Sequence, residues 1–168
     1  PSGKLTTTFP KSTGQVPIYY AQRRSGRPMH DGYIDIGNKP LYSFGYGLSY
    51  TTFTCSQVML SDSILHKKGA VTVSLNVTNT GSRTGKEVIQ LYVHDRISSV
   101  TQPDKRLIDF RKVELKAGEM KQVCFILSAQ QLKLWNKNLK EVFEGGEFDI
   151  FVGNSLDNLS QQVLKLAD

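Results

Sequence analysis

Two carboxylates, Asp31 and Asp35, are the first residues whose type and spacing suggest catalysis. Paired carboxylates can hydrolyse glycosidic bonds when they stand about 5 to 9.5 Å apart. In an extended chain these two side chains point to one side, roughly 13 Å apart at about 3.3 Å per residue. A folded loop would shorten that separation, but the spacing itself does not indicate a catalytic pair. We predict no catalytic residue in this sequence.

Metal and cofactor chemistry is not indicated either. The three histidines, His30, His66 and His94, are far apart in the sequence. His94 and Asp95 close an apolar strand-like run, where a solvated strand end is a more common role than a metal ligand. The sequence has no glycine-rich phosphate loop before a helix and no paired cysteine motif. We therefore predict no metal site and no cofactor.

The two cysteines, Cys55 and Cys124, allow at most one disulfide. Each lies in a strand-like apolar run, where a free cysteine acts as a small apolar residue. This setting favours free thiols, and the sequence leaves a pairing between the two open.

Composition excludes some partners. Lys and Arg number 21 against 15 Asp and Glu, a net charge of +6. The clustered arginines Arg23, Arg24 and Arg27 lie in a loop rich in Gly, Ser and Pro, which is not the basic stripe of a nucleic-acid site. No apolar run approaches the roughly 18 residues of a membrane span, so we predict no membrane insertion. The first residue, Pro1, is no methionine, so we expect a piece of a longer protein.

The stretch LYSFGYGLSY at residues 41–50 alternates large apolar side chains with small residues. Prolines are frequent before it, so we expect residues 1–47 to be extended and irregular. Such a segment needs another body to cover its aromatic side chains, and we predict that it wraps over a partner domain. The small residues between them, Gly45 and Gly47 included, permit close backbone approach. The predicted docking residues are Tyr42, Phe44, Tyr46, Leu48 and Tyr50.

From about residue 50 the pattern is that of short β-strands with turns between them. Alternation predicts strands around residues 71–77, 88–93, 113–115 and 123–127, with a turn at 79–85. One helical turn capped by Ser128 follows, then a hairpin across Gly145-Gly146 and a last edge strand at 163–166. The absence of long amphipathic helices predicts an all-β fold, an antiparallel β-sandwich of the immunoglobulin or fibronectin type III kind.

Several motifs resemble the C-terminal region of family 3 glycoside hydrolases of the β-glucosidase type. PSGKLTTTFPKSTGQVPIYY (1–20) and PLYSFGYGLSYTTF (40–53) are similar to the end of that family's α/β sandwich domain and its linker. GKEVIQLYVHD, KRLIDFRKVELKAGE and GGEFDIFVGNS resemble its fibronectin type III-like domain. The resemblance implies that residues 1–47 end the preceding domain and that residues 48–168 form the fibronectin type III-like domain. The family's catalytic motifs match no position of this sequence.

The resemblance implies a structural module of a larger enzyme that removes terminal non-reducing glycosyl residues. Its partners would be the catalytic domains of the same chain and the carbohydrate substrate of the parent enzyme. A carbohydrate-binding module and a dimerisation module, giving a homodimer of the parent, are the alternatives. The family further implies a periplasmic or secreted location.

Overall fold

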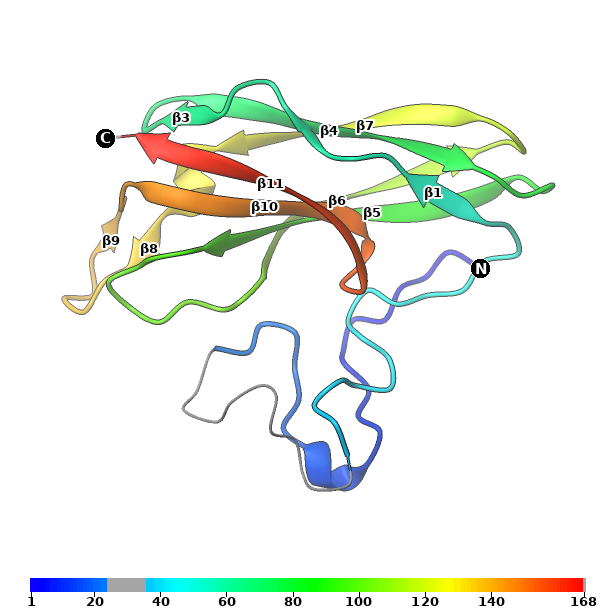
Figure 1. The fold of residues 1–168 in the computed structure, drawn as a ribbon, viewed down its shortest axis with the longest axis horizontal. Helices are drawn as coiled ribbons and strands as arrows, with labels where there is room; N and C mark the ends of the chain where they lie inside the picture. The colour runs from blue at the N-terminus through cyan, green and yellow to red at the C-terminus, as the bar shows by residue number, and fades with distance from the viewer. Residues whose placement is uncertain (24–35, 168) are drawn as a thin grey trace.

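The computed structural model describes residues 1–23 and 36–167, which form a two-layer β-sandwich and an N-terminal arm. The first sheet is built around the long strand β4 (Ala70–Asn79). On one side β4 pairs with β7 (Met120–Ser128), and on the other with β1 (Phe53–Cys55) and β2 (Met59–Leu60), all antiparallel. Figure 1 shows this sheet above the second one.

The second sheet has five strands in the order β3-β11-β10-β5-β6. Their bounds are Ile64–His66, Asn158–Ala167, Gly146–Ser155, Gly85–Asp95 and Arg106–Leu115, in that order. Neighbours are antiparallel except β3 and β11, which pair in parallel. A separate hairpin joins β8 (Leu134–Trp135) to β9 (Glu141–Val142).

The core lies between the two sheets and follows the predicted alternation. Val73, Leu75 and Val77 of β4 are fully buried and belong to one cluster with Ile89 and Leu91 of β5. Burying one such side chain contributes about 1.5 to 3 kcal/mol. The fold is therefore the predicted all-β sandwich of the fibronectin type III kind. The single helical turn is also confirmed, as a 3-10 helix at Ala129–Leu132 with Ser128 as its N-cap.

Two predictions about pairing are wrong. The strand at Glu141–Val142 does not form a hairpin with Gly146–Ser155 across the two glycines, because it pairs back onto Leu134–Trp135. Nor is β11 an edge strand, since β3 pairs along it at residues 165–167. In both cases a strand of two or three residues, too short to show a period in the sequence, takes the pairing.

The cysteines are free and lie on opposite faces of the first sheet. Cys55 pairs in register with Val77, a core residue, so its side chain points inward. Cys124 pairs with Ser74 and is exposed on the outer face. Because β4 runs between the two, their side chains do not meet, and no disulfide joins them.

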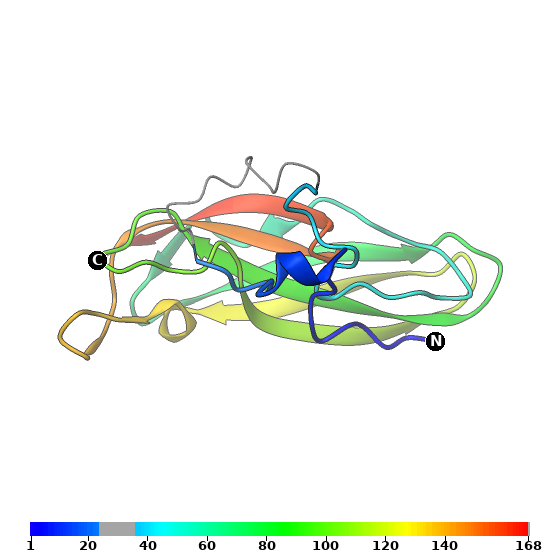
Figure 2. The ribbon, with the colours of Figure 1, turned by 90° about the horizontal axis from the view of Figure 1, so that it is seen from below.

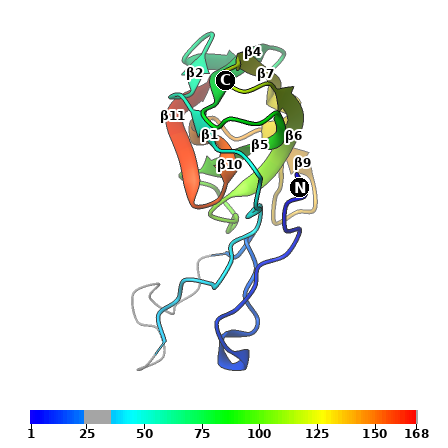
Figure 3. The same cartoon turned by 90° about the vertical axis from the view of Figure 1, so that its right-hand side faces the viewer.

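The N-terminal arm (residues 1–23 and 36–50) projects from the sandwich on the side of the second sheet, as Figures 1 and 3 show. The single turn of 3-10 helix at Thr13–Gln15 stands out from it, and the arm lies across that sheet when seen from below (Figure 2). Its two parts run side by side and are joined by backbone hydrogen bonds, such as Leu5 N to Tyr46 O at 2.8 Å. Asp31 and Asp35, the carboxylates considered and not predicted to be catalytic, lie outside the described residues, as do His30, Arg24 and Arg27.

Candidate docking surface

An aromatic cluster of three side chains, Phe9, Tyr42 and Tyr46, lies on the arm. The Tyr42 and Tyr46 rings stack with centroids 4.8 Å apart, and Phe9 meets Tyr42 edge-on at 6.5 Å. The backbone of Phe9 donates to Tyr42 O at 2.9 Å, and Leu41 N donates to Phe9 O at 2.8 Å. These bonds hold the two parts of the arm in register, so the cluster is a defined surface and not a set of separate side chains.

Residues 41–50 do not form the single extended ribbon that the alternation predicts. Tyr46 N donates to Ser43 O at 3.1 Å, and Gly45 has a φ of 79°, so the chain turns in the middle of the stretch. A left-handed residue of this kind is most easily a glycine. The turn sends Phe44 to the opposite side from its neighbours.

Phe44 packs towards the sandwich. Its ring stacks on Tyr20 at 4.2 Å, and Tyr20 meets Tyr92 of β5 edge-on at 6.2 Å. Tyr92 is fully buried, and burial raises the pKa of its phenol, with Tyr20 adding to the effect. Of the five predicted docking residues, Phe44 therefore already has a partner within this chain.

The other four keep exposed apolar surface. Tyr46 is half-buried in its stack with Tyr42, which is itself 41% exposed. Leu48 is 69% exposed and Tyr50 is 81% exposed. Large side chains with this much exposure, gathered on one segment, are typical of an interaction surface. Among these four, Tyr42 and Tyr46 form the stacked ring pair.

An ion pair fixes the base of the arm to the sandwich. Lys4 Nζ lies 2.7 Å from Glu87 Oε1, and both side chains are largely buried. The Glu87 carboxylate also accepts bonds from Val88 N at 2.8 Å and from Asn154 Nδ2 at 3.2 Å. A buried carboxylate with a charged partner and two further donors is well satisfied. Removal of Lys4 would therefore leave a buried negative charge without its counter-ion.

The backbone approaches closely at both Gly45 and Gly47, as the sequence predicts: at Gly45 to the sandwich and at Gly47 to the other part of the arm. A Cβ on Gly47 would lie 2.6 Å from the carbonyl oxygen of Gly3, and one on Gly45 would meet the side chain of Gln90. The Gln90 side chain is itself held in place, because its amide oxygen accepts a hydrogen bond from the Tyr92 hydroxyl. Close to this turn, Ser43 Oγ donates to Asp157 at 2.9 Å. The arm thus meets β5 at Gln90 and the β10–β11 turn at Asp157.

The sequence alone does not single out Lys4, Glu87 and Gln90 as attachment residues. A signal for them exists in β5, where VIQLYV is nearly continuous in large side chains instead of alternating with small polar ones. A strand with this pattern is buried on both faces. It therefore needs a cover on its outer face, and the arm is that cover.

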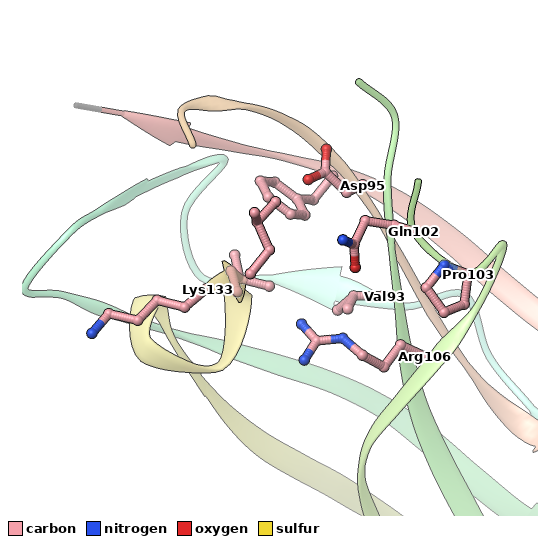
Figure 4. A pocket seen from close by; sticks show the side chains of 9 residues that line it. Val93, Asp95, Gln102, Pro103, Arg106 and Lys133 are labelled. Carbon is pink, nitrogen blue, oxygen red and sulfur yellow. The ribbon is translucent and has the colours of Figure 1, made fainter. Parts of the chain in front are cut away.

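A small cavity lies beside β5 at the end near the β8–β9 hairpin (Figure 4). Its volume is about 10 Å³, which is room for about one water molecule. Burial raises the pKa of Asp95 and lowers that of Arg106, two of its lining residues. Arg106 donates to Gln131 O at 2.6 Å. A cavity of this size cannot admit a sugar, so we assign it no substrate.

The surroundings of His94 do not support a role as a metal ligand, a role less common than that of a solvated strand end. The His94 ring contacts the carbonyl of Pro103 at 3.4 Å. Within residues 1–23 and 36–167, no group of three or more His, Cys, Asp or Glu side chains is placed to hold a metal ion. In the same residues, no helix has the length and apolar character to cross a bilayer.

Comparison with known proteins identifies the sandwich first. Residues 87–156 match the family of fibronectin type III-like domains. The chain is 47% identical over 161 residues to a periplasmic β-glucosidase of Salmonella typhimurium, covering 91% of this chain and 21% of that protein. It is 44% identical over 156 residues to a β-xylosidase of Formosa agariphila, with 92% and 22% covered.

A solved structure gives the same result. The β-glucosidase of Listeria innocua, in complex with glucose, superposes with a TM-score of 0.93 at 37% identity over all of this chain and 24% of that one. The class is thus a fibronectin type III-like sandwich with a preceding arm. The chain is similar to one part of β-glucosidases, which confirms the resemblance to the C-terminal region of family 3 glycoside hydrolases. It spans about a fifth of the length of the curated relatives it matches.

Proposed function

We propose that this chain is the structural module by which a β-glucosidase-type enzyme joins its fibronectin type III-like domain to its catalytic domains. The observation that carries the proposal is the exposed aromatic surface of an arm whose base is fixed to the sandwich. Residues 1–47 belong in this account to the end of the preceding domain, and residues 48–168 to the fibronectin type III-like domain. The docking residues are Tyr42, Tyr46, Leu48 and Tyr50, with Phe9 beside them.

The energetics support a docked arm. Complete burial of four such side chains at about 1.5 to 3 kcal/mol each gives an upper limit of roughly 6 to 12 kcal/mol. Much of the ordering cost of the arm is already met within the chain, because the Lys4–Glu87 pair and the Tyr20–Tyr92 contact hold it. A surface that is ordered before it docks loses less entropy on docking, so more of the burial energy remains as net attraction.

The parent enzyme, in this proposal, hydrolyses terminal non-reducing glycosyl residues with two carboxylates and a covalent glycosyl intermediate. Those carboxylates belong to its other domains. The names of the relatives, β-glucosidase and β-xylosidase, indicate glucosides and xylosides as substrate classes. The periplasmic relative supports a periplasmic or secreted location.

The test compares the isolated chain with the full-length enzyme on nitrophenyl β-glucoside and β-xyloside. We expect saturable hydrolysis by the full-length enzyme and none by residues 1–168 alone. Turnover by the isolated chain would contradict a purely structural role. A full-length protein inactive on both substrates would contradict the proposed parent activity.

A homodimer of the parent is the alternative use of the same aromatic surface. Light scattering of the full-length enzyme, and of a variant that lacks this module, separates the two. A monomer in both cases supports intramolecular docking, whereas a dimer that disappears with the module would favour dimerisation.

A further inference from the structure

A second exposed aromatic site lies on the sandwich itself, on the β8–β9 hairpin. Trp135, the only tryptophan in the sequence, is 63% exposed there. An exposed indole ring offers a flat apolar face together with a polar N–H at its edge, which suits contact with a partner. The described part of the arm contacts β5, the β10–β11 turn and residues 103–104, and it leaves Trp135 exposed. Docking through the arm therefore does not account for Trp135.

Charged groups stand on the same face of the hairpin as the indole. Glu141 is the cross-strand partner of Trp135, which places the two side chains about 4.5 to 5.5 Å apart at Cβ. Lys133 Nζ lies 3.4 Å from Glu141 Oε2 and 4.8 Å from the centroid of the Phe143 ring. The site thus combines a flat apolar ring with one acceptor and one donor group, both partly open to solvent.

The hairpin turn holds this arrangement in place. The Asn136 side chain accepts from the backbone of Asn138 at 2.9 Å and of Lys140 at 3.1 Å. Asn136 N donates in turn to Lys140 O at 3.0 Å. The turn closes with Leu139 at a φ of 55°, a left-handed conformation that leucine rarely adopts. A turn this constrained presents Trp135 and Glu141 at fixed positions.

We propose that Trp135, Glu141 and Lys133 form a binding site for a neutral β-linked polysaccharide chain. The indole would pack on the C–H face of a pyranose ring, while Glu141 accepts from a sugar hydroxyl and Lys133 donates to another. The charges of Lys133 and Glu141 balance each other, which suits a neutral ligand rich in donors and acceptors. An anionic lipid surface or an acidic protein would instead select for charge of one sign.

This inference rests on the proposed function, since a polymer-binding site has a use in an enzyme that acts on carbohydrate. It goes beyond that function because it concerns retention on an insoluble polymer and not hydrolysis. The experiment measures retention of the full-length enzyme on insoluble cellulose and on insoluble xylan, by depletion from the supernatant. Three proteins are compared: the unaltered enzyme, Trp135→Ala and Phe110→Ala.

We expect the unaltered enzyme to be retained on at least one polymer, and Trp135→Ala to weaken that retention about tenfold. Phe110 is the matched control, because it is an aromatic residue on another part of the sandwich with a similar exposure of 61%. Phe110→Ala should be retained like the unaltered enzyme. A third variant, Glu141→Gln, should weaken retention about threefold because the neutral amide is a poorer acceptor.

Three outcomes would overturn the site. The first is no retention of the unaltered enzyme on either polymer. The second is retention of Trp135→Ala equal to that of the unaltered enzyme. The third is a loss of retention in Phe110→Ala as large as the loss in Trp135→Ala. The last result would mean general adsorption through exposed aromatics. Hydrolysis of soluble nitrophenyl glycoside is measured alongside and should be the same in all variants. Absence of hydrolysis by the unaltered enzyme would instead count against the proposed function. A failure of the binding site and a failure of the proposed function are therefore distinguishable.

Discussion

The arm and the sandwich use the same kinds of side chain in opposite ways. In the sandwich, Phe125 and Tyr92 are fully buried, and long antiparallel ladders satisfy the backbone. In the arm, Tyr50 is 81% exposed, and the backbone makes a few isolated bonds, such as that from Phe9 to Tyr42. The sandwich is stabilised by its own core. The arm is ordered by its attachment to the sandwich, and its outer surface is incomplete.

The difference shows that an alternating pattern predicts a face but not what covers it. In β4 the apolar face that the alternation creates is covered by the opposite sheet of the same chain. In residues 41–50 the large apolar side chains are covered only in part, by the contact of Phe44 with Tyr20. Changes in the two regions should therefore differ in size and in how far their effects spread.

The largest effect is expected in the core, from Phe125→Ala. Removal of this buried ring should lower the free energy of unfolding of the chain by about 3 to 5 kcal/mol. Because the arm depends on the sandwich, both regions should lose their structure together in urea. Phe110→Ala, at an exposed position, should change the same free energy by less than about 0.5 kcal/mol. An arm that stays ordered after the Phe125→Ala sandwich unfolds would contradict this dependence.

The next effect tests the ion pair between the two regions. Lys4→Met should destabilise the chain by about 1.5 to 3 kcal/mol, because Glu87 would keep its charge at a largely buried position. Lys86→Met is the matched control, since Lys86 pairs at 3.4 Å with Glu114 and both side chains are about half exposed. Surface pairs of that kind contribute less than about 1 kcal/mol. Equal losses in the two variants, measured by urea denaturation, would show that Lys4 does not anchor the arm.

Gly45→Ala tests the close approach of the arm to β5. Alanine at a left-handed φ costs about 1 to 2 kcal/mol, and here the new methyl group would also meet Gln90. Gly118 has a similar φ of 74° with open space around it, so Gly118→Ala measures the backbone cost alone. Gly45→Ala should therefore be the more destabilising of the two. A Gly118→Ala variant that is as unstable would mean that the contact with Gln90 has no effect.

The smallest effect is the pH dependence from Cys55. Burial raises the pKa of this thiol to about 11, with Glu87 adding to the shift and Lys4 opposing it. The unfolded chain loses the thiol proton near pH 9, before the folded chain does, so the free energy of unfolding falls as pH rises from about 9 to about 11. Cys55→Ala should make that decline shallower, whereas Cys124→Ala, at an exposed position, should not. An unchanged decline in Cys55→Ala would contradict the buried thiol.

The long strands and the core could be predicted from the sequence because their periodicity is strong. Residues 71–77 alternate cleanly and are buried at every second position. The short strand β3 and the pairing of β8 with β9 could not be predicted, since two or three residues carry no period and tertiary contacts decide their pairing.

The candidate surface was predicted in part. Tyr42, Leu48 and Tyr50 are exposed, but the turn at Gly45 separates Phe44 from them. Glycine permits a left-handed turn as readily as an extended chain, so the residues of this stretch do not distinguish a turn from an extended strand. The Lys4–Glu87 pair joins residues 83 positions apart in the chain, and no local pattern indicates such a pairing.

The central claim is that the exposed side chains of the arm are covered by the rest of the enzyme. The most direct test is the double variant Leu48→Ala/Tyr50→Ala, made in the full-length enzyme and in the isolated chain. In the isolated chain both side chains are already exposed, so the free energy of unfolding should change by less than about 0.5 kcal/mol. In the full-length enzyme their removal should destabilise the protein by about 2 to 4 kcal/mol. The same small change in both proteins would contradict the docking account.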